Sequence, residues 1–314
     1  MKKNSLPPAI FVMGPTASGK TDLAIKLIET LPAEIVSVDS AMVYRDMNIG
    51  TAKPDADTLR IAPHRLIDIL DPVDSYSAAE FCVDAQREMQ TITEEGKIPI
   101  LVGGTMLYFK ALQQGLAPLP SADQQVRSDI EAEASERGWA ALHQDLAKID
   151  CVAAERIHPN DPQRIQRALE IYRITGRSIS SLQRDQVKTN LPYRLSKLVV
   201  APSDRAVLHQ RIADRFDLML KQGFLDEVRE LRKRDDLDLN KPSMRSVGYR
   251  QVWQHLNGDF DQAGMREKAI IATRQLAKRQ FTWLRSEQGC NWFDSLETDI
   301  YPGVLEQLRL DGVN

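Results

Sequence analysis

The sequence predicts an α/β fold in which helices flank a parallel sheet. Short apolar runs alternate with helical segments over the first third of the chain, and the first apolar run leads directly into a glycine-rich loop. After Gly115 this alternation stops, and Pro118 and Pro120 precede a long segment rich in Ala, Glu, Gln and Arg. Alternating strands and helices are typical of parallel sheets, and the later change of pattern indicates an all-helical insertion.

The strands that we expect are short and apolar. They cover Ala9–Met13, Ala33–Val38, Ile98–Val102 and Leu198–Val200, and the aromatic segment Asn291–Phe293 adds a last strand. Apolar positions at helical spacing, together with glycines at the segment ends, predict the helices. These helices cover Asp22–Leu31, Ser77–Gly96, Asp204–Gln222, Phe224–Arg234, Val247–Leu256 and Met265–Ser286.

The length of 314 residues is enough for two domains. We expect an α/β core domain formed by residues 1–117 and 196–314. Residues 118–195 would form a helical insertion domain, because the segment from Ser121 to Tyr193 contains no convincing strand.

The composition is that of an ordinary soluble protein, with a formal net charge of −3. No apolar stretch reaches the roughly 18 residues of a membrane-spanning helix, and the first residues lead into prolines and a strand in place of a signal peptide. Cys82, Cys151 and Cys290 are too far apart for a zinc module or a disulfide framework, and we expect them to be buried. The sequence therefore predicts a cytoplasmic protein without membrane contact. We also expect it to be a monomer, although these observations do not bear on its oligomeric state.

A phosphate-binding motif follows the first expected strand. Residues 14–21 read G-x-x-x-x-G-K-T, and in such a loop backbone N–H groups converge on phosphate oxygens at the start of a helix. Lys20 adds a positive charge, and the hydroxyl of Thr21 can ligate Mg²⁺. The motif predicts a P-loop NTPase-like core that binds a di- or triphosphate through Gly14, Pro15, Thr16, Ala17, Ser18, Gly19, Lys20 and Thr21.

Two further polar segments follow expected strands. Asp39 and Ser40 come after the second strand, and Gly103 to Thr105 come after the third. Parallel sheets bind ligands at the carboxyl ends of their strands, so we expect these segments to meet the P-loop in one crevice. Asp39 can accept a proton from a nucleophile there, although an acid at a strand end can also cap a turn. The long polar loop from Asp39 to Pro54 favours the functional interpretation.

Basic residues are unevenly spread along the chain. Lys and Arg outnumber Asp and Glu between Asn160 and Lys197 and again between Arg266 and Arg285. Such segments are either solvated helix faces or, when they gather on one surface, a track for the phosphates of a nucleic acid.

Besides the P-loop, the sequence contains the ordered motifs Asp39–Pro54, Val102–Tyr108, Ile157–Glu170, Met244–Gln251 and Lys278–Arg285. Together these motifs closely resemble those of the tRNA dimethylallyltransferases, also called tRNA isopentenyltransferases, of the bacterial type. The resemblance spans about residues 9 to 286. It implies transfer of a dimethylallyl group from dimethylallyl diphosphate to N6 of the adenosine at position 37 of tRNA, next to the anticodon, with Mg²⁺ assisting.

The resemblance also gives roles to the residues of the crevice. Lys20 and the loop amides, with Mg²⁺ held by Thr21 of the P-loop, would stabilise a departing diphosphate. Asp39 would be the general base for the amine, and Thr16 and Thr105 are candidate catalytic hydroxyls.

Arg215 matches a diphosphate-binding arginine of the family, and a guanidinium suits that anion. The sequence alone also allows an exposed helix arginine at this position.

By the same resemblance, the basic segments contact the anticodon stem-loop of tRNA, whose target base must leave the stack. For Trp283 and Tyr249 we favour packing over stacking on a base. The residues expected to contact tRNA are Asp39, Ser40, Ala41, Met42, Thr105, Arg127, Gln163, Arg164, Ile165, Gln166, Arg167, Arg245, Ser246, Val247, Gly248, Tyr249, Arg250, Lys278, Arg279, Gln280, Phe281, Thr282, Trp283, Leu284 and Arg285.

One residue departs from the family pattern, and three other functions stay open. Many relatives carry Gln at the position of Met42, and Met lacks the hydrogen bonds of an amide.

The alternatives are a P-loop kinase of a small metabolite, an adenylate isopentenyltransferase acting on free nucleotides, and a non-catalytic RNA-binding protein. The kinase leaves the helical insertion without a role, and the basic helices argue against a free nucleotide as acceptor.

Overall fold

The structure, a computed structural model, describes residues 6–185 and 190–313. The chain divides into two compact units, one formed by Met1–Leu112 with Pro192–Asn314 and the other by Gln113–Leu191. These divisions lie a few residues from the boundaries expected from the sequence. We refer to the first as the core unit and to the second as the helical unit.

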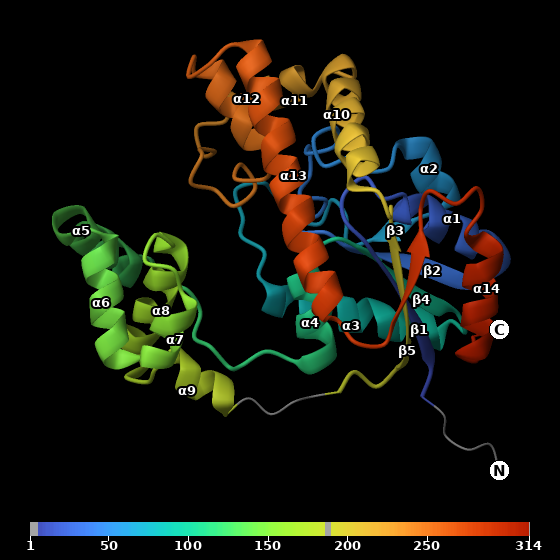
Figure 1. The fold of residues 1–314 in the computed structure, drawn as a ribbon, viewed down its shortest axis with the longest axis horizontal. Helices are drawn as coiled ribbons and strands as arrows, with labels where there is room; N and C mark the ends of the chain where they lie inside the picture. Colours follow the sequence, from blue (N-terminus) through green and yellow to red (C-terminus); the bar gives the residue numbers. More distant parts are fainter. Residues whose placement is uncertain (1–5, 186–189, 314) are drawn as a thin grey trace. The chain divides into compact units, whose positions relative to one another are not determined.

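The core unit is built on a six-stranded sheet with the strand order β3-β2-β4-β1-β5-β6 (Figure 1). All the pairings between neighbouring strands are parallel, which confirms the predicted fold class. The strands are β1 (Pro8–Met13), β2 (Ala33–Val38), β3 (His64–Arg65), β4 (Ile98–Gly103), β5 (Arg194–Ala201) and β6 (Cys290–Asp294).

Helices cover both faces of this sheet because the central strands are apolar on both sides. On one face, Ile10 and Val12 pack in a buried cluster with α1 (Lys20–Thr30) and α14 (Tyr301–Leu310). On the other face, the ring of Phe11 lies 5.0 Å from that of Phe109 in α4 (Met106–Gln114). The long helix α3 (Ala78–Glu94) begins with a capping box between Ser77 and Glu80 and also packs on β2 and β4.

Four further helices form a second buried cluster with the loop that follows β2. They are α10 (Arg205–Lys221), α11 (Phe224–Arg232), α12 (Tyr249–Leu256) and α13 (Gln262–Ser286). Phe224 lies at its centre, with the rings of Phe216 and Tyr249 meeting it edge to face at 6.2 and 5.0 Å. This packing holds the long polar loop against the helices and gives it a defined conformation.

The helical unit contains α5 (Gln124–Arg137), α6 (Trp139–Ile149), α7 (Cys151–Arg156), α8 (Pro162–Thr175) and α9 (Ile179–Arg184). Ile130, Leu142, Leu146 and Leu169 are among the residues of its core. Aspartate or serine side chains cap α5, α7, α8 and α9, in agreement with the usual start signals of helices. Its described residues include no strand, as the sequence predicts.

The structure corrects two expectations about individual elements and residues. Periodicity did not predict α2 (Ala56–Ile61), β3, α4 or α14, of which β3 has only two residues and α2 has six. Cys151 is exposed, and Cys82 and Cys290 are half-buried, so the prediction that all the cysteines are buried is wrong. In residues 6–185 and 190–313, no helix has both the length and the apolar character needed to cross a membrane.

Candidate active site

The P-loop connects the end of β1 to the start of α1 through a tightly constrained turn. Gly19 has a φ of 88°, in the left-handed region that glycine adopts at little cost. A Cβ on Gly14 would lie 2.3 Å from the carbonyl oxygen of Val200 in β5, so this strand approaches too closely for any other residue. The hydroxyl of Ser18 is buried and has no hydrogen-bond partner among the described residues. The P-loop thus contains a hydroxyl without a hydrogen-bond partner at the position where phosphate oxygens would bind.

Two cations lie at this loop without a counter-ion. Lys20 donates a hydrogen bond to the carbonyl of Pro15 over 3.2 Å, and neither Lys20 nor Arg215 forms a salt bridge with any described residue. Burial and the charge of Arg215 lower the pKa of Lys20 to about 8, and the weaker attraction of Asp39 only partly opposes this. Burial also lowers the pKa of Arg215, which argues against the solvated helix arginine that the sequence allowed. A bound anion would stabilise the charged forms of both side chains and raise their pKa values.

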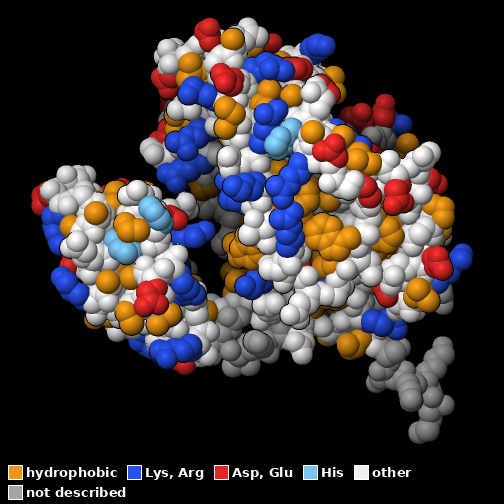
Figure 2. Space-filling view, in the orientation of Figure 1, with side chains coloured by type: hydrophobic (Ala, Val, Ile, Leu, Met, Phe, Trp, Pro, Cys, Tyr) orange, Lys and Arg blue, Asp and Glu red, His pale blue; other side chains and the backbone are white. Residues whose placement is uncertain are grey.

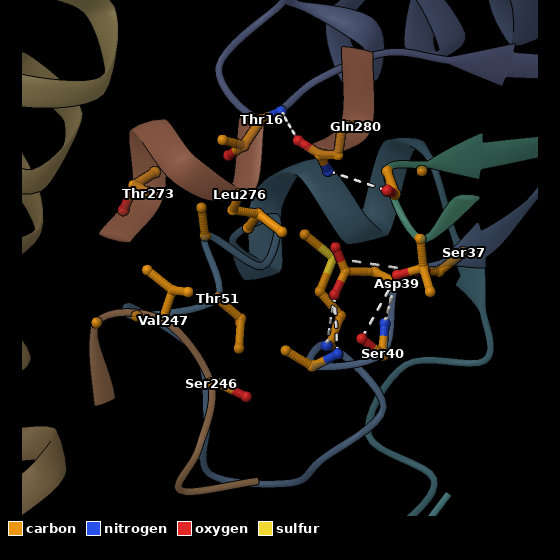
Figure 3. A pocket seen from close by; sticks show the side chains of 18 of the residues that line it. Thr16, Ser37, Asp39, Ser40, Thr51, Ser246, Val247, Thr273, Leu276 and Gln280 are labelled. Carbon is orange, nitrogen blue, oxygen red and sulfur yellow. Dashed lines mark hydrogen bonds between the residues drawn. The ribbon is translucent and has the colours of Figure 1, made fainter. Parts of the chain in front are cut away.

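Asp39 both caps a turn and faces the crevice (Figure 3). Its Oδ1 accepts hydrogen bonds from the N–H groups of Ala41 and Met42, at 2.8 and 3.3 Å. None of the described residues bonds its Oδ2, which is therefore available to a ligand. The N–H of Ser40 donates to Oγ1 of Thr105 over 3.1 Å, which joins the loops after β2 and β4.

These loops surround a cavity of about 590 Å³. Thr16, Lys20, Asp39 and Thr105 line it, as the topology of the strands predicts, and so does Arg215 of α10. Apolar side chains complete the wall, so that the cavity combines a cationic end with surfaces suited to a hydrocarbon. The apolar lining residues include Ala17, Met42, Tyr44, Ile212, Phe216, Met219 and Leu276.

A second cavity, of about 790 Å³, shares part of the same lining. Lys20, Thr21 and Arg215 line both cavities. The cationic side chains of the P-loop region are therefore accessible from two hollows of the core unit.

Glu227 of α11 is a site-shaping residue that the sequence did not single out. Its carboxylate accepts hydrogen bonds from the consecutive N–H groups of Asn48, Ile49 and Gly50, at 2.9, 2.7 and 3.1 Å. The hydroxyl of Tyr249 donates to the same carboxylate over 2.5 Å. Gly50 and Tyr249 line the cavity, so Glu227 fixes part of its wall without lining it. No sequence signal distinguished Glu227 from the other acids of a surface helix.

The residues of the core unit that were expected to contact tRNA differ in their exposure. Arg245, Arg250, Lys278, Arg279, Thr282, Trp283 and Arg285 are exposed. Figure 2 shows Lys and Arg side chains gathered along α13. A second group is buried and consists of Gly248, Tyr249, Gln280 and Leu284. A third group is partly exposed and consists of Ala41, Met42, Ser246, Val247 and Phe281. Ser40 is exposed. Tyr249 packs against Phe224, in agreement with the packing role that we favoured for it.

The expected tRNA contacts in the helical unit are also divided. Gln163 and Arg164 are exposed, whereas Ile165 is fully buried in the core of the unit. Arg127 and Arg167 both bond the carboxylate of Glu170, which is 0% exposed. Gln166 bonds Glu131 and the carbonyl of Arg127. Arg127, Gln166 and Arg167 thus hold the helices of this unit together.

Within the described part of the chain, no group of three or more His, Cys, Asp or Glu side chains could hold a metal ion. Thr21, at the start of α1, contributes a hydroxyl to the lining of the cavity, and an oxygen ligand of this kind suits a hard cation beside a bound phosphate. That arrangement is typical of Mg²⁺, which usually keeps waters and substrate phosphates among its ligands.

Comparisons with known proteins agree with this geometry. The chain matches the IPP transferase family over residues 42–287. It is similar to the crystal structure of the full-length tRNA isopentenylpyrophosphate transferase from Bacillus halodurans. The two sequences are 35% identical, and the match covers 97% of this chain and 98% of that chain with a TM-score of 0.70. For the tRNA delta(2)-isopentenylpyrophosphate transferase from Staphylococcus epidermidis the identity is 32%, the coverage 97% and 99%, and the TM-score 0.70.

A eukaryotic dimethylallyltransferase acting on tRNA is 25% identical, with coverage of 98% of this chain and 79% of that chain and a TM-score of 0.80. The family match covers more than half of the chain, and the two bacterial enzymes are similar over nearly its full length. The resemblance inferred from the motifs is thereby confirmed, and the chain belongs to the IPP transferase family of enzymes.

Proposed function

We propose that this protein transfers the dimethylallyl group of dimethylallyl diphosphate to N6 of adenosine 37 in tRNA, giving N6-isopentenyladenosine. One observation carries the proposal most strongly. Lys20 and Arg215, two cations without a salt-bridge partner among the described residues, line the same cavity as Asp39 and an apolar wall. The two cations suit a diphosphate, the apolar wall suits the short hydrocarbon joined to it, and Asp39 suits the proton of an attacking amine.

At the donor end, the P-loop binds the diphosphate and stabilises it as the leaving group. An exocyclic adenine amine is a weak nucleophile, so the allylic carbon must become strongly electrophilic as its bond to oxygen breaks. Lys20, Arg215 and the N–H groups of the loop are fixed before the reaction and neutralise the charge that develops on the diphosphate. Thr16 lines the cavity, and its hydroxyl is suited to bond the bridging oxygen.

Mg²⁺ fits the same end of the cavity. Thr21 begins α1 and lines the cavity, which gives a hydroxyl ligand beside the phosphate position. When bound, Mg²⁺ supplies additional charge neutralisation to the diphosphate oxygens.

At the acceptor end, Asp39 receives the proton of the amine. A bond forms between N6 and the allylic carbon, the bond from that carbon to the diphosphate oxygen breaks, and one N6 proton passes to Oδ2 of Asp39. Oδ1 stays bonded to Ala41 and Met42, which fixes the direction of the carboxylate. Thr105 stands beside Ser40 on the neighbouring loop and is suited to orient the incoming base.

The tRNA acceptor is supported by the exposed cations of α13. Lys278, Arg279 and Arg285 are exposed and form no salt bridge with any described residue, so their charges are free for phosphates. The target base must leave the anticodon loop to enter the cavity, as base-modifying enzymes require. Gln163 and Arg164 of the helical unit are exposed and suited to further contacts with the anticodon stem-loop. We place this reaction in the cytoplasm, by a monomer.

A single assay separates this function from its alternatives. Purified protein is incubated with dimethylallyl diphosphate and Mg²⁺ in the presence of unmodified tRNA or of AMP, and with ATP alone. The proposal expects a C5 addition to adenosine in tRNA, none on AMP, and no turnover of ATP. Modification of AMP would favour an adenylate isopentenyltransferase, and ATP turnover without the isoprenoid donor would favour a kinase.

A further inference from the structure

Gln280 lies in the middle of the basic motif of α13, yet its side chain is only 8% exposed. Lys278 and Arg279 before it are exposed, and so are Thr282 and Trp283 after it. The side chain turns away from the exposed basic face and into the wall of the cavity (Figure 3). An RNA contact, which the motif suggested for this residue, does not account for a buried amide.

Both ends of the Gln280 amide are bonded to loops of the active site. The N–H of Thr16 donates to Oε1 over 2.9 Å, and Nε2 donates to the carbonyl oxygen of Gly104 over 2.9 Å. A backbone N–H can only donate and a carbonyl can only accept, so the two partners fix the orientation of the amide. Gln280 therefore joins three segments that are distant in sequence: the P-loop, the turn after β4, and α13.

The space around Gly104 is fitted to this contact. A Cβ at Gly104 would lie 2.3 Å from Nε2 of Gln280 and 3.3 Å from the carbonyl oxygen of Gly14. No side chain at residue 104 is compatible with the observed position of the amide. The glycine and the glutamine form one packed unit between the donor and acceptor loops.

The two bonds act on neighbours of the proposed reacting groups. Thr16 belongs to the diphosphate-binding loop, and Gly104 precedes Thr105, whose hydroxyl is bonded to Ser40 beside Asp39. One side chain thus sets the spacing between the loop that would hold the diphosphate and the loop that would orient the base. Prenyl transfer depends on that spacing, because the amine must approach the allylic carbon at close range.

We propose that Gln280 is a positioning residue for prenyl transfer. From α13, the helix that carries the basic face, its amide holds the P-loop and the turn after β4 at a fixed position relative to each other. This inference rests on the proposed function. It assigns Gln280 to the alignment of the two substrates and leaves the binding of RNA to its exposed neighbours. Because Gln280 is on the same rigid helix as Lys278 and Arg279, it also links the docking of RNA phosphates on α13 to the geometry of the diphosphate site.

The test is the isosteric variant Gln280→Met, which keeps the volume and removes both hydrogen bonds. Steady-state kinetics should give a kcat lowered by about 10- to 100-fold, as expected for misplaced reactants. The Kd for tRNA and its salt dependence should stay those of the wild type. Gln275→Met is the matched control on an exposed position of the same helix, and it should leave kcat unchanged.

A double-mutant cycle separates positioning from a merely structural role. Gly104→Ala should lower kcat strongly in the wild type, because the new Cβ displaces the amide. The same substitution should have a much smaller effect when Gln280 is already Ala, since the shorter side chain leaves room. Additive effects, with thermal unfolding of all the variants above the assay temperature, would overturn the proposal.

The competing role as an RNA contact gives the opposite pattern. A weaker tRNA Kd, a reduced salt slope and an unchanged kcat in Gln280→Met would show that the residue contacts RNA. This outcome overturns the inference while the wild type still prenylates tRNA, so the proposed function survives it. Failure of the wild type to prenylate tRNA would instead refute the proposed function itself.

Discussion

The N–H of Ser40 donates a hydrogen bond to Oγ1 of Thr105 across the ends of two neighbouring strands. Ser40 follows β2 and Thr105 follows β4, and these strands pair in parallel along their length. The contact fixes Asp39 beside the turn after β4 and opposite the P-loop. One carboxylate, Asp39, and two cations, Lys20 and Arg215, thus line a single cavity.

Replacing Asp39 by Asn should abolish most of the prenyl transfer while leaving donor binding intact. The amide can still accept hydrogen bonds from Ala41 and Met42, but it cannot take up the proton of the amine. A loss of about 10² to 10⁴ in kcat is expected for a missing general base. Single-turnover rates with tRNA, together with the Kd for inorganic diphosphate, measure the two effects separately. A variant with nearly normal turnover would exclude Asp39 as the base.

Lys20 should make diphosphate binding depend on pH above neutrality. Its pKa of about 8 means that the ligand-free protein loses this charge as the pH rises through 8. The Kd for inorganic diphosphate should therefore rise between pH 7 and pH 9, with proton uptake on binding at the higher pH. Calorimetric titrations over this range test the expectation, and a Kd that does not depend on pH would contradict it.

The same lysine should destabilise the ligand-free protein. Its folded pKa of about 8 lies below the ordinary value of 10.5, so the unfolded chain binds more protons between these pH values. The cost of the buried charge is therefore full below pH 8 and falls as the pH rises from 8 to 10.5. Lys20→Met should raise the free energy of unfolding at pH 7 by up to about 3 kcal/mol, since one pKa unit corresponds to about 1.4 kcal/mol. Lys26→Met, at an exposed position of α1, is the control, and equal stabilities would count against a buried Lys20 charge.

Glu227→Gln should impair turnover through the loop from Asn48 to Gly50. The carboxylate accepts from three backbone N–H groups and from Tyr249, whereas an amide has only one accepting oxygen. We expect a lower kcat and a changed KM for tRNA, with the Kd for diphosphate unchanged because the P-loop is not involved. Glu230→Gln is the control, since Glu230 is exposed one turn further along α11 and pairs with Lys233. Identical kinetics for both variants would refute the role of Glu227.

Arg127 and Arg164 should behave differently although the sequence suggested RNA binding for both. Arg127 bonds the buried Glu170, which keeps Arg167 as a partner, so Arg127→Ala should destabilise the helical unit by about 1.5 to 3 kcal/mol, the cost of hydrogen bonds lost to a charged group. Arg164 is exposed, so Arg164→Ala should change stability by less than about 0.5 kcal/mol and should instead weaken tRNA binding. Hydrogen exchange of α8 and filter binding of tRNA measure these effects. Equal stability of the two variants would contradict the structural role of Arg127.

Lys278→Ala should weaken tRNA binding in a salt-dependent way. Lys278 is exposed and has no salt-bridge partner among the described residues, so its charge is available to a phosphate. The slope of log Kd against log salt should fall in magnitude by about 1. Lys233→Ala is the control, because Lys233 is bonded to Glu230 on α11. An unchanged slope would remove Lys278 from the RNA-binding surface.

Local patterns were sufficient to predict most of the fold. The apolar runs of β1, β2 and β4 and the P-loop between β1 and α1 carry strong local signals, and the rule on strand ends then brought Asp39, Thr105 and Lys20 together. The elements that were missed are short or weakly periodic, such as β3, which exists through its pairing with Ile35 and Val36. Pairing of this kind is a tertiary effect that the sequence of a dipeptide cannot reveal.

The site was predicted less completely, because exposure depends on tertiary packing. Gln280 and Arg279 are adjacent in a basic motif, yet one is buried between two loops and the other is exposed. Arg167 reads as a phosphate contact, but its guanidinium bonds Glu170 and the carbonyl of Pro120. Glu227 has no local signal at all, since its three backbone partners lie about 180 residues earlier in the chain. Each of these roles depends on which distant segment lies opposite the side chain.

The central claim is that the P-loop holds the diphosphate of an isoprenoid donor whose allylic carbon faces Asp39. A crystal structure with a non-reactive thio analogue of dimethylallyl diphosphate tests it most directly. The account predicts the diphosphate within hydrogen-bond distance of Lys20 and the loop amides, with the hydrocarbon against the apolar wall. A diphosphate found more than about 10 Å from Lys20, roughly two helical turns away, would contradict it.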